Sequence, residues 1–474
     1  MALDLMPWQQ LVAWIFMIYV LFASAVYLVL NGIAYSSLRE YARNKRLDTD
    51  LSLYTGLEPP ITVIVPAFNE GTTIVSSVQS ILQLHYPNLE VVIVNDGSRD
   101  NTLDALIKAF RFEPFEEAVR SRIDTRPVRQ VYLSRSINNL RLVDKENGGK
   151  ADAINVGINI ARSPLFCCVD ADSVLEPASL LKIVQPFLDN PDTVASGGTV
   201  RIANGCMVRH GHVVRRGIPG NLLALFQLVE YLRAFLFGRL GWARFNGLLI
   251  ISGAFGVFHK ESVIKAGGYA TGTIGEDMEL IVRLHRLSSE PGIRGVVAFT
   301  PDPVCWTEAP ERLADFRNQR VRWHRGLSES LWLNRGLLFN PRGGAAGWLA
   351  FPFFVIVEWG SPFIELAGYL FTAYLLLTTD LGLMPIVIVY GFAVSMSVLL
   401  STIGFLMDEI TFPGATRLRD VVILTVFSFL ECFGYRQLNM YYRIRGAIMW
   451  MSGTKSTWGT MSRSGSWQKK ATAS

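Results

Sequence analysis

An unbroken apolar run near the N-terminus constrains this chain more than any other feature. Leu11–Leu30 contains no charged residue, and about 20 apolar residues suffice for a helix to cross the roughly 30 Å of hydrocarbon in a bilayer. A cleaved signal peptide is the alternative. Asp4 precedes the run, no Lys or Arg does, and the run is too long, all of which argue against a signal peptide. The run therefore predicts a membrane helix.

Basic residues follow this run at once. They are Arg39, Arg43, Lys45 and Arg46. Segments rich in Lys and Arg beside a membrane helix stay in the cytoplasm. We therefore expect residues 1–50 to form a transmembrane helix and a basic linker, with the N-terminus outside and the following segment in the cytoplasm.

The composition fits a membrane protein. Hydrophobic residues make up 50% of the 474 residues and charged residues 18%, which excludes a disordered chain and disfavours an ordinary soluble enzyme. The net charge of +5 is mild and forms no basic stripe, so we expect no nucleic-acid partner. The five cysteines include no CxxC pair, which argues against a zinc site.

The segment 51–336 has the composition of a soluble domain. Ile61–Val65, Val91–Val94 and Leu165–Val169 are short apolar runs typical of buried strands, and Thr72–Leu84 has helical spacing. Strands that alternate with helices predict a parallel, doubly wound α/β sheet. Ligands bind to such sheets beyond the carboxyl ends of the strands. We therefore expect the chemistry in the segments that follow these strands.

The segment 337–450 is apolar again. We expect three spans in it, near Pro362–Thr379, Met384–Met407 and Val421–Phe433. Trp348–Trp359 is short and aromatic, which favours an interfacial or re-entrant segment. Three spans would leave the tail 451–474 outside, yet the chain from Arg436 onward holds seven Lys or Arg and no acid and should be cytoplasmic. Either one assignment is wrong or Trp348–Trp359 belongs to an additional crossing.

Acidic residues follow two of the predicted strands. Asp96 comes shortly after Val94, where it suits a hydrogen bond to a base or ribose, although a turn or a helix cap is the alternative. Asp170 and Asp172 follow Val169 directly. Two carboxylates so close together are costly without a cation. They suit Mg²⁺ or Mn²⁺ shared with a diphosphate.

Two further motifs open predicted helices. Gly148-Gly149-Lys150 suits a phosphate, because backbone N–H groups and a lysine meet there, but a plain loop explains it equally well. Glu276 and Asp277 are either the usual acidic bias of a helix N-terminus or a general base near the metal site. Neither motif decides between these alternatives alone.

A basic and aromatic run extends from Gln319 to Gly326. Amphipathic packing or attraction to anionic lipid would explain it without any ligand. Arg322 is otherwise suited to offset the charge of a diphosphate. Trp323 is suited to stack on the face of a sugar, because an indole has an apolar face and a polar edge.

In their order and spacing, these motifs resemble the family 2 glycosyltransferases that carry membrane helices. The matches to that family's D, DxD, ED and QxxRW set are Asp96, Asp170-x-Asp172, Glu276-Asp277 and Gln319-x-x-Arg322-Trp323. The most similar members would be processive synthases of poly-N-acetylglucosamine, chitooligosaccharide, hyaluronan and cellulose. The resemblance implies a GT-A α/β catalytic domain flanked by transmembrane helices. Gly275 stands where many polymerising members have a threonine.

The resemblance also implies a role for each residue. The UDP-sugar donor would be bound by Asp96, Lys150 and Asp170. The metal, Mg²⁺ or Mn²⁺, would be held by Asp172. The catalytic pair would be Glu276 and Asp277, with Asp277 as the general base. The acceptor end and the diphosphate would be held by Gln319, Arg322 and Trp323.

The implied function is an inverting transfer that extends a β-linked polysaccharide at the bacterial inner membrane, with the catalytic domain in the cytoplasm. Glu358, Glu365 and Glu431 would line a polar exit path through the lipid bilayer, beyond which secretion partners would receive the growing glycan. The alternative is that Glu358 and Glu365 sit at the membrane interface. Transfer of one or a few sugars to a lipid acceptor is the alternative. A catalytically dead scaffold and a pure transporter are disfavoured, because all the acids are present and a transporter needs no α/β domain.

Overall fold

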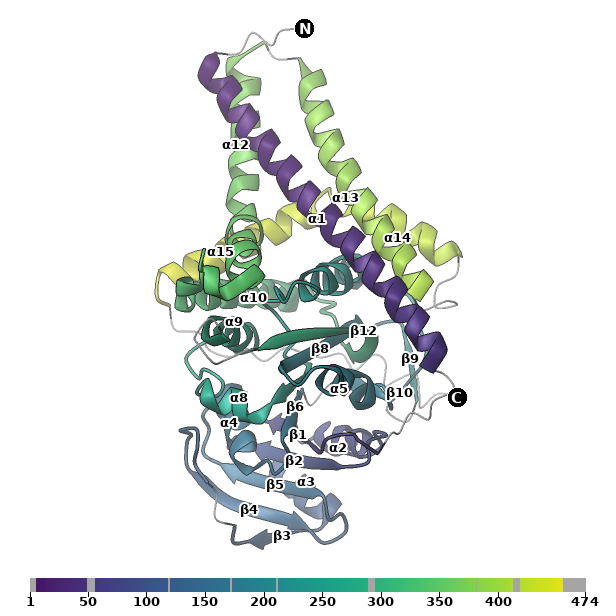
Figure 1. Ribbon diagram of the computed structural model, residues 1–474. Coiled ribbons are helices and arrows are strands. Elements are labelled where there is room, and N and C mark those ends of the chain that lie inside the picture. Colours follow the sequence, from purple (N-terminus) through teal and green to yellow (C-terminus); the bar gives the residue numbers. More distant parts are fainter. Residues whose placement is uncertain are drawn as a thin grey trace.

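The computed structural model describes residues 6–48, 56–117, 120–170, 173–209, 212–288, 295–380, 382–411 and 418–454. Figure 1 shows an α/β domain below and a group of helices that rise from it. The expected metal ligand Asp172 and most of the expected tail 451–474 lie outside the described residues.

A ten-stranded sheet forms the centre of the α/β domain, in the order β3-β4-β5-β2-β1-β6-β11-β8-β12-β7. The strands are β1 (Ile61–Ala67), β2 (Leu89–Asn95), β3 (Phe112–Phe115), β4 (Val128–Ser134), β5 (Leu140–Lys145), β6 (Leu165–Val169), β7 (Val174–Leu175), β8 (Thr193–Ile202), β11 (Phe255–His259) and β12 (Val296–Thr307). A separate two-stranded sheet pairs β9 (Met207–Arg209) with β10 (His212–Arg215).

The expected parallel pairing holds for only part of this sheet. The neighbours β5, β2, β1 and β6 run parallel, but β11 is antiparallel to both β6 and β8. The sheet is therefore mixed, and the expectation of parallel strands holds for its central part only. The first residue of β11, Phe255, pairs with the last residue of β6, Val169. The chain thus enters β11 at the edge of the sheet where β6 ends. A parallel strand would require the chain to cross to the opposite edge first.

Helices cover both faces of the sheet. Side chains alternate along a strand, so Ile64 and Val92 pack with α4 (Lys150–Ile160), whereas Val63 and Val91 pack in a second cluster. That second cluster contains residues of α2 (Ile74–Leu82), α3 (Thr102–Phe110) and α5 (Ser179–Asp189). Two separate cores on opposite faces confirm the expected doubly wound α/β architecture.

The register of the sheet places the acidic strand ends together. β1 pairs in parallel with β2 on one side and with β6 on the other. Asp96 follows the end of β2, and Asp170 follows the end of β6. Both therefore lie at the same edge of the sheet.

The remaining helices of this domain are α6 (Leu222–Tyr231), η1 (Leu232–Gly238), α7 (Arg239–Ala243), α8 (Lys260–Lys265), α9 (Glu276–Ser288) and α10 (Leu313–Leu333).

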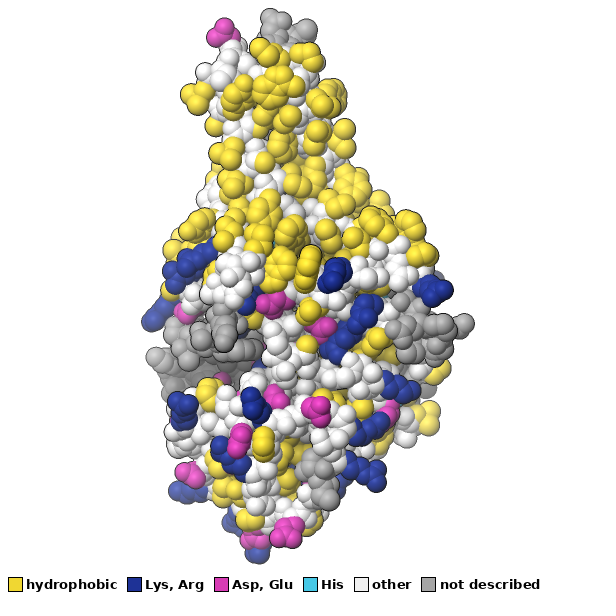
Figure 2. Space-filling view, turned by 90° about the vertical axis from the view of Figure 1, so that its left-hand side faces the viewer, with side chains coloured by type: hydrophobic (Ala, Val, Ile, Leu, Met, Phe, Trp, Pro, Cys, Tyr) yellow, Lys and Arg dark blue, Asp and Glu magenta, His cyan; other side chains and the backbone are white. Residues whose placement is uncertain are grey.

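In the part of the chain that the structure describes, three helices are long and apolar enough to cross a membrane. They are α1 (Pro7–Asp48), α12 (Ser361–Thr378) and α13 (Leu383–Thr411). They project away from the α/β domain in Figure 1. On the face shown in Figure 2 the projecting part is covered mainly by hydrophobic side chains, whereas Lys, Arg, Asp and Glu gather below it. This division identifies a membrane protein.

The expected span at Val421–Phe433 is not among the helices of spanning length in the described part of the chain. The helix there, α14 (Leu418–Leu430), has only 13 residues, which gives a length of about 20 Å against roughly 30 Å of hydrocarbon. α14 packs beside α13, and α15 (Tyr435–Met451) packs along α10. Both lie near the base of the projecting helices in Figure 1.

The segment expected to be interfacial, Trp348–Trp359, forms a series of short helical turns. They are η4 (Ala346–Ala350), α11 (Phe351–Phe353) and η5 (Phe354–Trp359). Phe351 and Phe353 are buried in the same cluster that holds α4, while Trp348 is exposed. One side of the segment therefore belongs to the core, and an aromatic side chain remains on the surface.

Candidate active site

A cavity of about 2400 Å³ opens at the edge of the sheet where the acidic strand ends meet. It is lined by eight of the nine residues that the sequence singles out, namely Asp96, Lys150, Asp170, Glu276, Asp277, Gln319, Arg322 and Trp323. The ninth, Asp172, lies outside the described residues. The fold thus gathers side chains from five separate segments of the α/β domain around one space.

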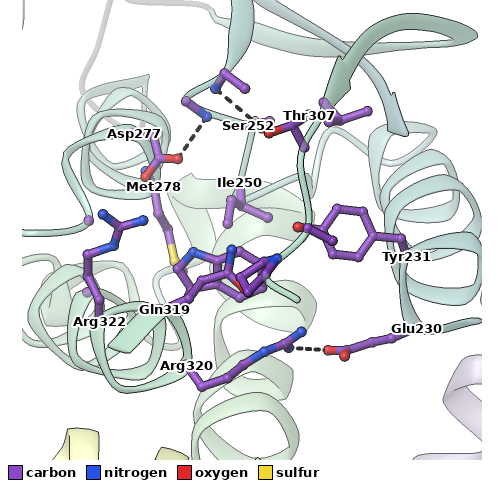
Figure 3. A pocket seen from close by; sticks show the side chains of 18 of the residues that line it. Glu230, Tyr231, Ile250, Ser252, Asp277, Met278, Thr307, Gln319, Arg320 and Arg322 are labelled. Atoms are coloured by element: carbon purple, nitrogen blue, oxygen red, sulfur yellow. Dashed lines mark hydrogen bonds and ion pairs between the residues drawn. The ribbon is translucent and has the colours of Figure 1, made fainter. Parts of the chain in front are cut away.

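Asp277 lies in the first turn of α9 and faces this cavity. Its Oδ2 accepts a hydrogen bond from the backbone N–H of Gly253 at 2.9 Å (Figure 3). Its Oδ1 accepts one from the N–H of Met278 at 2.8 Å. A Cβ at position 253 would lie 2.9 Å from Oδ2. A side chain at position 253 would therefore displace this carboxylate oxygen or the turn that holds it. Figure 3 also shows Arg322 pointing toward Asp277 from α10.

Lys150 joins two of the predicted carboxylates. Its Nζ lies 2.6 Å from Oδ1 of Asp170 and 3.6 Å from Oε1 of Glu276. Burial alone would lower the pKa of Lys150, but the two carboxylates raise the pKa above its usual value. The lysine therefore stays charged and balances the acidic side of the site.

Glu276 is buried behind Asp277. Burial raises its pKa to about 7; the positive charge of Lys150 opposes this rise, and the negative charge of Asp277 adds to it. The two adjacent carboxyls therefore differ in environment: Glu276 is enclosed, whereas Asp277 is half-buried at the cavity wall. Both residues line the cavity, and Asp277 is the more exposed of the two.

Asp96 holds the glycine turn that starts α4. Its carboxylate accepts hydrogen bonds from the backbone N–H groups of Gly148 at 2.9 Å and Gly149 at 2.8 Å, and from Nδ2 of Asn147 at 3.1 Å. Gly149 has φ +89°, a conformation that favours glycine. These contacts bring Lys150, the first residue of α4, to the cavity.

Lys145 is a functional candidate that the sequence analysis missed. It is completely buried (0% exposed), and its Nζ lies 2.6 Å from both Asp96 Oδ1 and Asp152 Oδ2. A buried lysine between two carboxylates fixes their orientation. The sequence feature that could have identified Lys145 is its position as a charged residue at the end of the apolar strand β5, three residues before Gly148.

α10 supplies the opposite wall. Gln319 is buried, and its Oε1 has no hydrogen-bond partner in the part of the chain that the structure describes. Trp323 is 37% exposed at the cavity, with its ring 6.4 Å from that of Tyr231. An unsatisfied amide oxygen and an accessible indole face are suitable contacts for a sugar.

The cavity continues to the membrane helices. Its lining there includes the three acids expected on the exit path, Glu358, Glu365 and Glu431. Each has a polar partner far away in sequence. The hydroxyl of Tyr27 donates to Glu358 Oε1 at 2.7 Å. Nε of Arg436 lies 3.0 Å from Glu365 Oε1. Arg233 forms an ion pair with Glu431. Sequence reasoning missed these partners, because the contacts link residues that lie 71 to 331 positions apart.

The carboxylates at the end of β6 fit a hard divalent cation. Within the described ranges, no three His, Cys, Asp or Glu side chains form a metal-binding group. Asp170 is about one-third exposed (32%) at the cavity, and the second acid of the pair, Asp172, lies outside the description. Carboxylate oxygens are the ligands that Mg²⁺ and Mn²⁺ prefer, so the chemistry of the donor set suits either metal.

Two family models match the chain. The first, Glycosyl transferase family 2, covers residues 62–263. The second, Glycosyl transferase family group 2, covers residues 165–407, slightly more than half of the chain. Together they cover nearly all of the α/β domain, α12 and most of α13.

Curated relatives point to the same family. The chain is 28% identical over 313 residues to a poly-β-1,6-N-acetyl-D-glucosamine synthase of Staphylococcus aureus strain COL, covering 65% of this chain and 63% of the relative. It is 27% identical over 308 residues to the synthase of the same name from Staphylococcus epidermidis, with the same coverage. The chain therefore matches less than two thirds of the length of these relatives.

The fold has a counterpart among solved structures. The mannosyltransferase PcManGT from Pyrobaculum calidifontis, solved with GDP-Man and Mn²⁺, is 18% identical and has a TM-score of 0.50, with 91% of this chain and 100% of that one covered. This likeness supports the GT-A-like arrangement of sheet and helices. With the motifs gathered around one cavity and a family model that spans more than half of the sequence, the chain belongs to the family 2 glycosyltransferases.

Proposed function

We propose that this protein transfers sugar units from a UDP-sugar to the end of a β-linked polysaccharide, with inversion at the anomeric carbon. The observation that carries the proposal is the continuity of the cavity, which extends over about 2400 Å³ from the strand-end carboxylates to α1, α12, α13 and α15. Small-molecule pockets usually occupy about 300–1,000 Å³. The additional space suits several sugar units of an acceptor, and the similarity to staphylococcal poly-β-1,6-N-acetyl-D-glucosamine synthases supports a polymer as product.

Asp277 is the proposed general base. It takes the proton from the acceptor hydroxyl while the hydroxyl oxygen bonds to the anomeric carbon. The bond from that carbon to the diphosphate oxygen breaks, and UDP leaves with the electron pair. The N–H groups of Gly253 and Met278 keep the carboxylate oriented toward the cavity. One displacement inverts the configuration, so no carboxylate nucleophile is required.

Lys150 and Asp170 are the proposed contacts to the donor. They form an ion pair at the cavity wall, and the family resemblance assigns such positions to the nucleotide-sugar. Glu276 supports the pair from behind through Lys150. Asp96 is proposed to act at the nucleotide end, because it lines the cavity and holds the glycine turn that leads into α4.

The departing diphosphate needs positive charge. Asp170 and Asp172 are proposed to hold Mg²⁺ or Mn²⁺, which when bound would offset that charge. Arg322 supplies a further cation from α10, since it lines the cavity and points toward Asp277. Gln319 and Trp323 are proposed to hold the acceptor end, Gln319 through its Oε1 and Trp323 by stacking.

We further propose that synthesis is coupled to secretion across a bacterial inner membrane. With α1, α12 and α13 as the spans, the N-terminus is outside and the catalytic domain is cytoplasmic. α12 leads outward and α13 leads back, so the basic C-terminal tail also lies in the cytoplasm. This topology removes the conflict that a fourth span at α14 would create. The acids Glu358, Glu365 and Glu431 form the polar path for the glycan.

The test uses purified protein in nanodiscs with Mg²⁺ or Mn²⁺. UDP-N-acetylglucosamine, UDP-glucose, UDP-galactose and UDP-glucuronate are supplied separately, and UDP release and product size are followed. We expect one donor to give a long polymer that a β-specific glycosidase digests. UDP release with only a short or lipid-linked product would instead favour transfer of a few sugars to a lipid. No UDP release with any donor would contradict the proposal.

A further inference from the structure

Arg320 lies within the acceptor motif, between Gln319 and Arg322, but the family motif assigns it no role. It is 4% exposed. Its Cζ lies 4.8 Å from the ring centroid of Phe316 and 4.7 Å from that of Trp323. These three residues are spaced four and three positions apart, so they share one face of α10. The guanidinium is therefore stacked on the indole that faces the cavity.

A carboxylate from another helix fixes this guanidinium. Arg320 Nη1 donates to Oε1 of Glu230 at the end of α6 (Figure 3). The other oxygen of Glu230 accepts from the hydroxyl of Tyr435 at 2.7 Å. Tyr435 is the first residue of α15, and its ring packs 5.5 Å from that of Phe316. The contacts thus connect three helices around one charged group.

Few other groups hold Arg320 in place. Among the described residues, its Nε and Nη2 have no hydrogen-bond partner. The orientation of the guanidinium therefore depends on Glu230 and on the two aromatic rings. In turn, the guanidinium covers part of Trp323, whose ring centroid also lies 6.4 Å from that of Tyr231.

We propose that Arg320 is a positioning residue that holds the Trp323 indole at the angle needed to stack on the acceptor sugar. Through Glu230 and Tyr435 it also links this indole to α15, beside the membrane helices. The proposal rests on the function proposed above, in which Trp323 contacts the growing glycan. If the indole is free to rotate, the glycan is released earlier. Donor binding, which involves the opposite wall of the cavity, is unaffected.

The test is Arg320→Lys. Lysine keeps the positive charge and can still reach a carboxylate, but it lacks the planar group that stacks on an indole. We expect the median product length to fall about threefold to tenfold, because the planar guanidinium–indole stack is lost. The KM for the UDP-sugar should stay within about twofold of wild type. Glu230→Gln and Tyr435→Phe should shorten the product in the same direction.

The chain offers a matched control. Arg335 also stacks on a tryptophan, with its Cζ 4.8 Å from the ring of Trp332, but this pair lies exposed at the end of α10, outside the cavity lining. Arg335→Lys should therefore leave product length unchanged. A length effect of Arg335→Lys equal to that of Arg320→Lys would overturn the proposal.

A double-mutant cycle distinguishes positioning from a general structural role. If Arg320 acts through the indole, Arg320→Lys should shorten the product in the wild-type background but add nothing in a Trp323→Ala background. Additive effects would refute the proposal, as would unchanged product length or a parallel loss of donor affinity. If the wild-type enzyme makes only short or lipid-linked product, the proposed polymerisation and this inference both fail. If the wild-type enzyme makes polymer and Arg320→Lys makes polymer of the same length, this inference alone fails.

Discussion

The backbone N–H of Gly253 donates a hydrogen bond to the carboxylate of Asp277, with 2.9 Å between the nitrogen and Oδ2. The two residues come from different segments: Gly253 lies in the turn before β11, and Asp277 lies in the first turn of α9. The bond leaves the rest of the carboxylate at the cavity wall. The turn before β11 therefore sets the direction in which the proposed base faces.

Asp277→Asn should abolish transfer and preserve donor binding. The amide oxygen can still accept from Gly253, but an amide does not take a proton from a hydroxyl. We expect a loss of about 10²–10⁴-fold in kcat, measured as UDP release. Stabilisation of the protein by UDP in a thermal shift assay should persist. Loss of both properties together would contradict the assignment of Asp277 as base.

Gly253→Ala should impair catalysis by displacing the base. The added Cβ would lie 2.9 Å from Oδ2 of Asp277, so either the carboxylate or the turn must move. We expect kcat to fall on the order of tenfold or more, with the KM for the donor nearly unchanged. Gly272→Ala is the control in the loop before α9, because a Cβ there meets no atom within 4 Å. Equal effects of the two substitutions would argue against the prediction.

Lys145→Met should destabilise the α/β domain strongly. The change removes the cation that lies 2.6 Å from both Asp96 and Asp152 and leaves two buried carboxylates without it. Removal of one partner from a buried ion pair costs about 3–5 kcal/mol of unfolding free energy. Thermal unfolding in nanodiscs measures the effect. Arg122→Met is the comparison, because its pair with Glu261 is exposed and should contribute little. Similar losses in both variants would contradict the expectation.

His285 should make the folded state sensitive to acid. It is buried in α9, with its Nε2 2.9 Å from the carbonyl oxygen of Leu248, and burial lowers its pKa to about 4. In the unfolded chain the pKa is about 6.5. The unfolded state therefore binds the proton first as the pH falls from 6.5 toward 4, and stability is lost over that range. At pH 5 the loss is on the order of 2 kcal/mol.

The measurement for His285 is the melting temperature between pH 7.5 and 5. His285→Gln removes the titrating group, so the variant should lose less stability than wild type over this interval. Other groups titrate in both proteins and cancel in the comparison. Identical pH profiles would show that His285 makes no contribution.

Removal of divalent cations should stop transfer. If Asp170 and Asp172 hold Mg²⁺ or Mn²⁺, an excess of chelator should abolish UDP release, and addition of either metal should restore it. Asp172→Asn should weaken the metal dependence by raising the concentration needed for half-maximal activity. Full activity in excess chelator would refute the metal assignment.

Much of this protein is readable from local sequence patterns. The apolar run at Leu11–Leu30 predicts a span, and α1 includes it. The segments after the apolar strands are predicted to carry the chemistry, and the structure gathers Asp96 and Asp170 from two of them around one cavity. These predictions succeed because hydropathy and strand alternation are local properties, and because parallel strands end at a common edge.

Tertiary structure alone decided the direction of β11, the burial of Lys145, the contact of Gly253 with Asp277, and the partners of the acids in the cavity. Tyr27 and Glu358 are 331 positions apart, and no local pattern pairs them. The amino-acid sequence determined which segments are apolar and where acids follow strands. The packing of the helices around the sheet determined which distant groups pair with a buried charge. A buried charge is costly unless a partner compensates it, and only the fold brings that partner near.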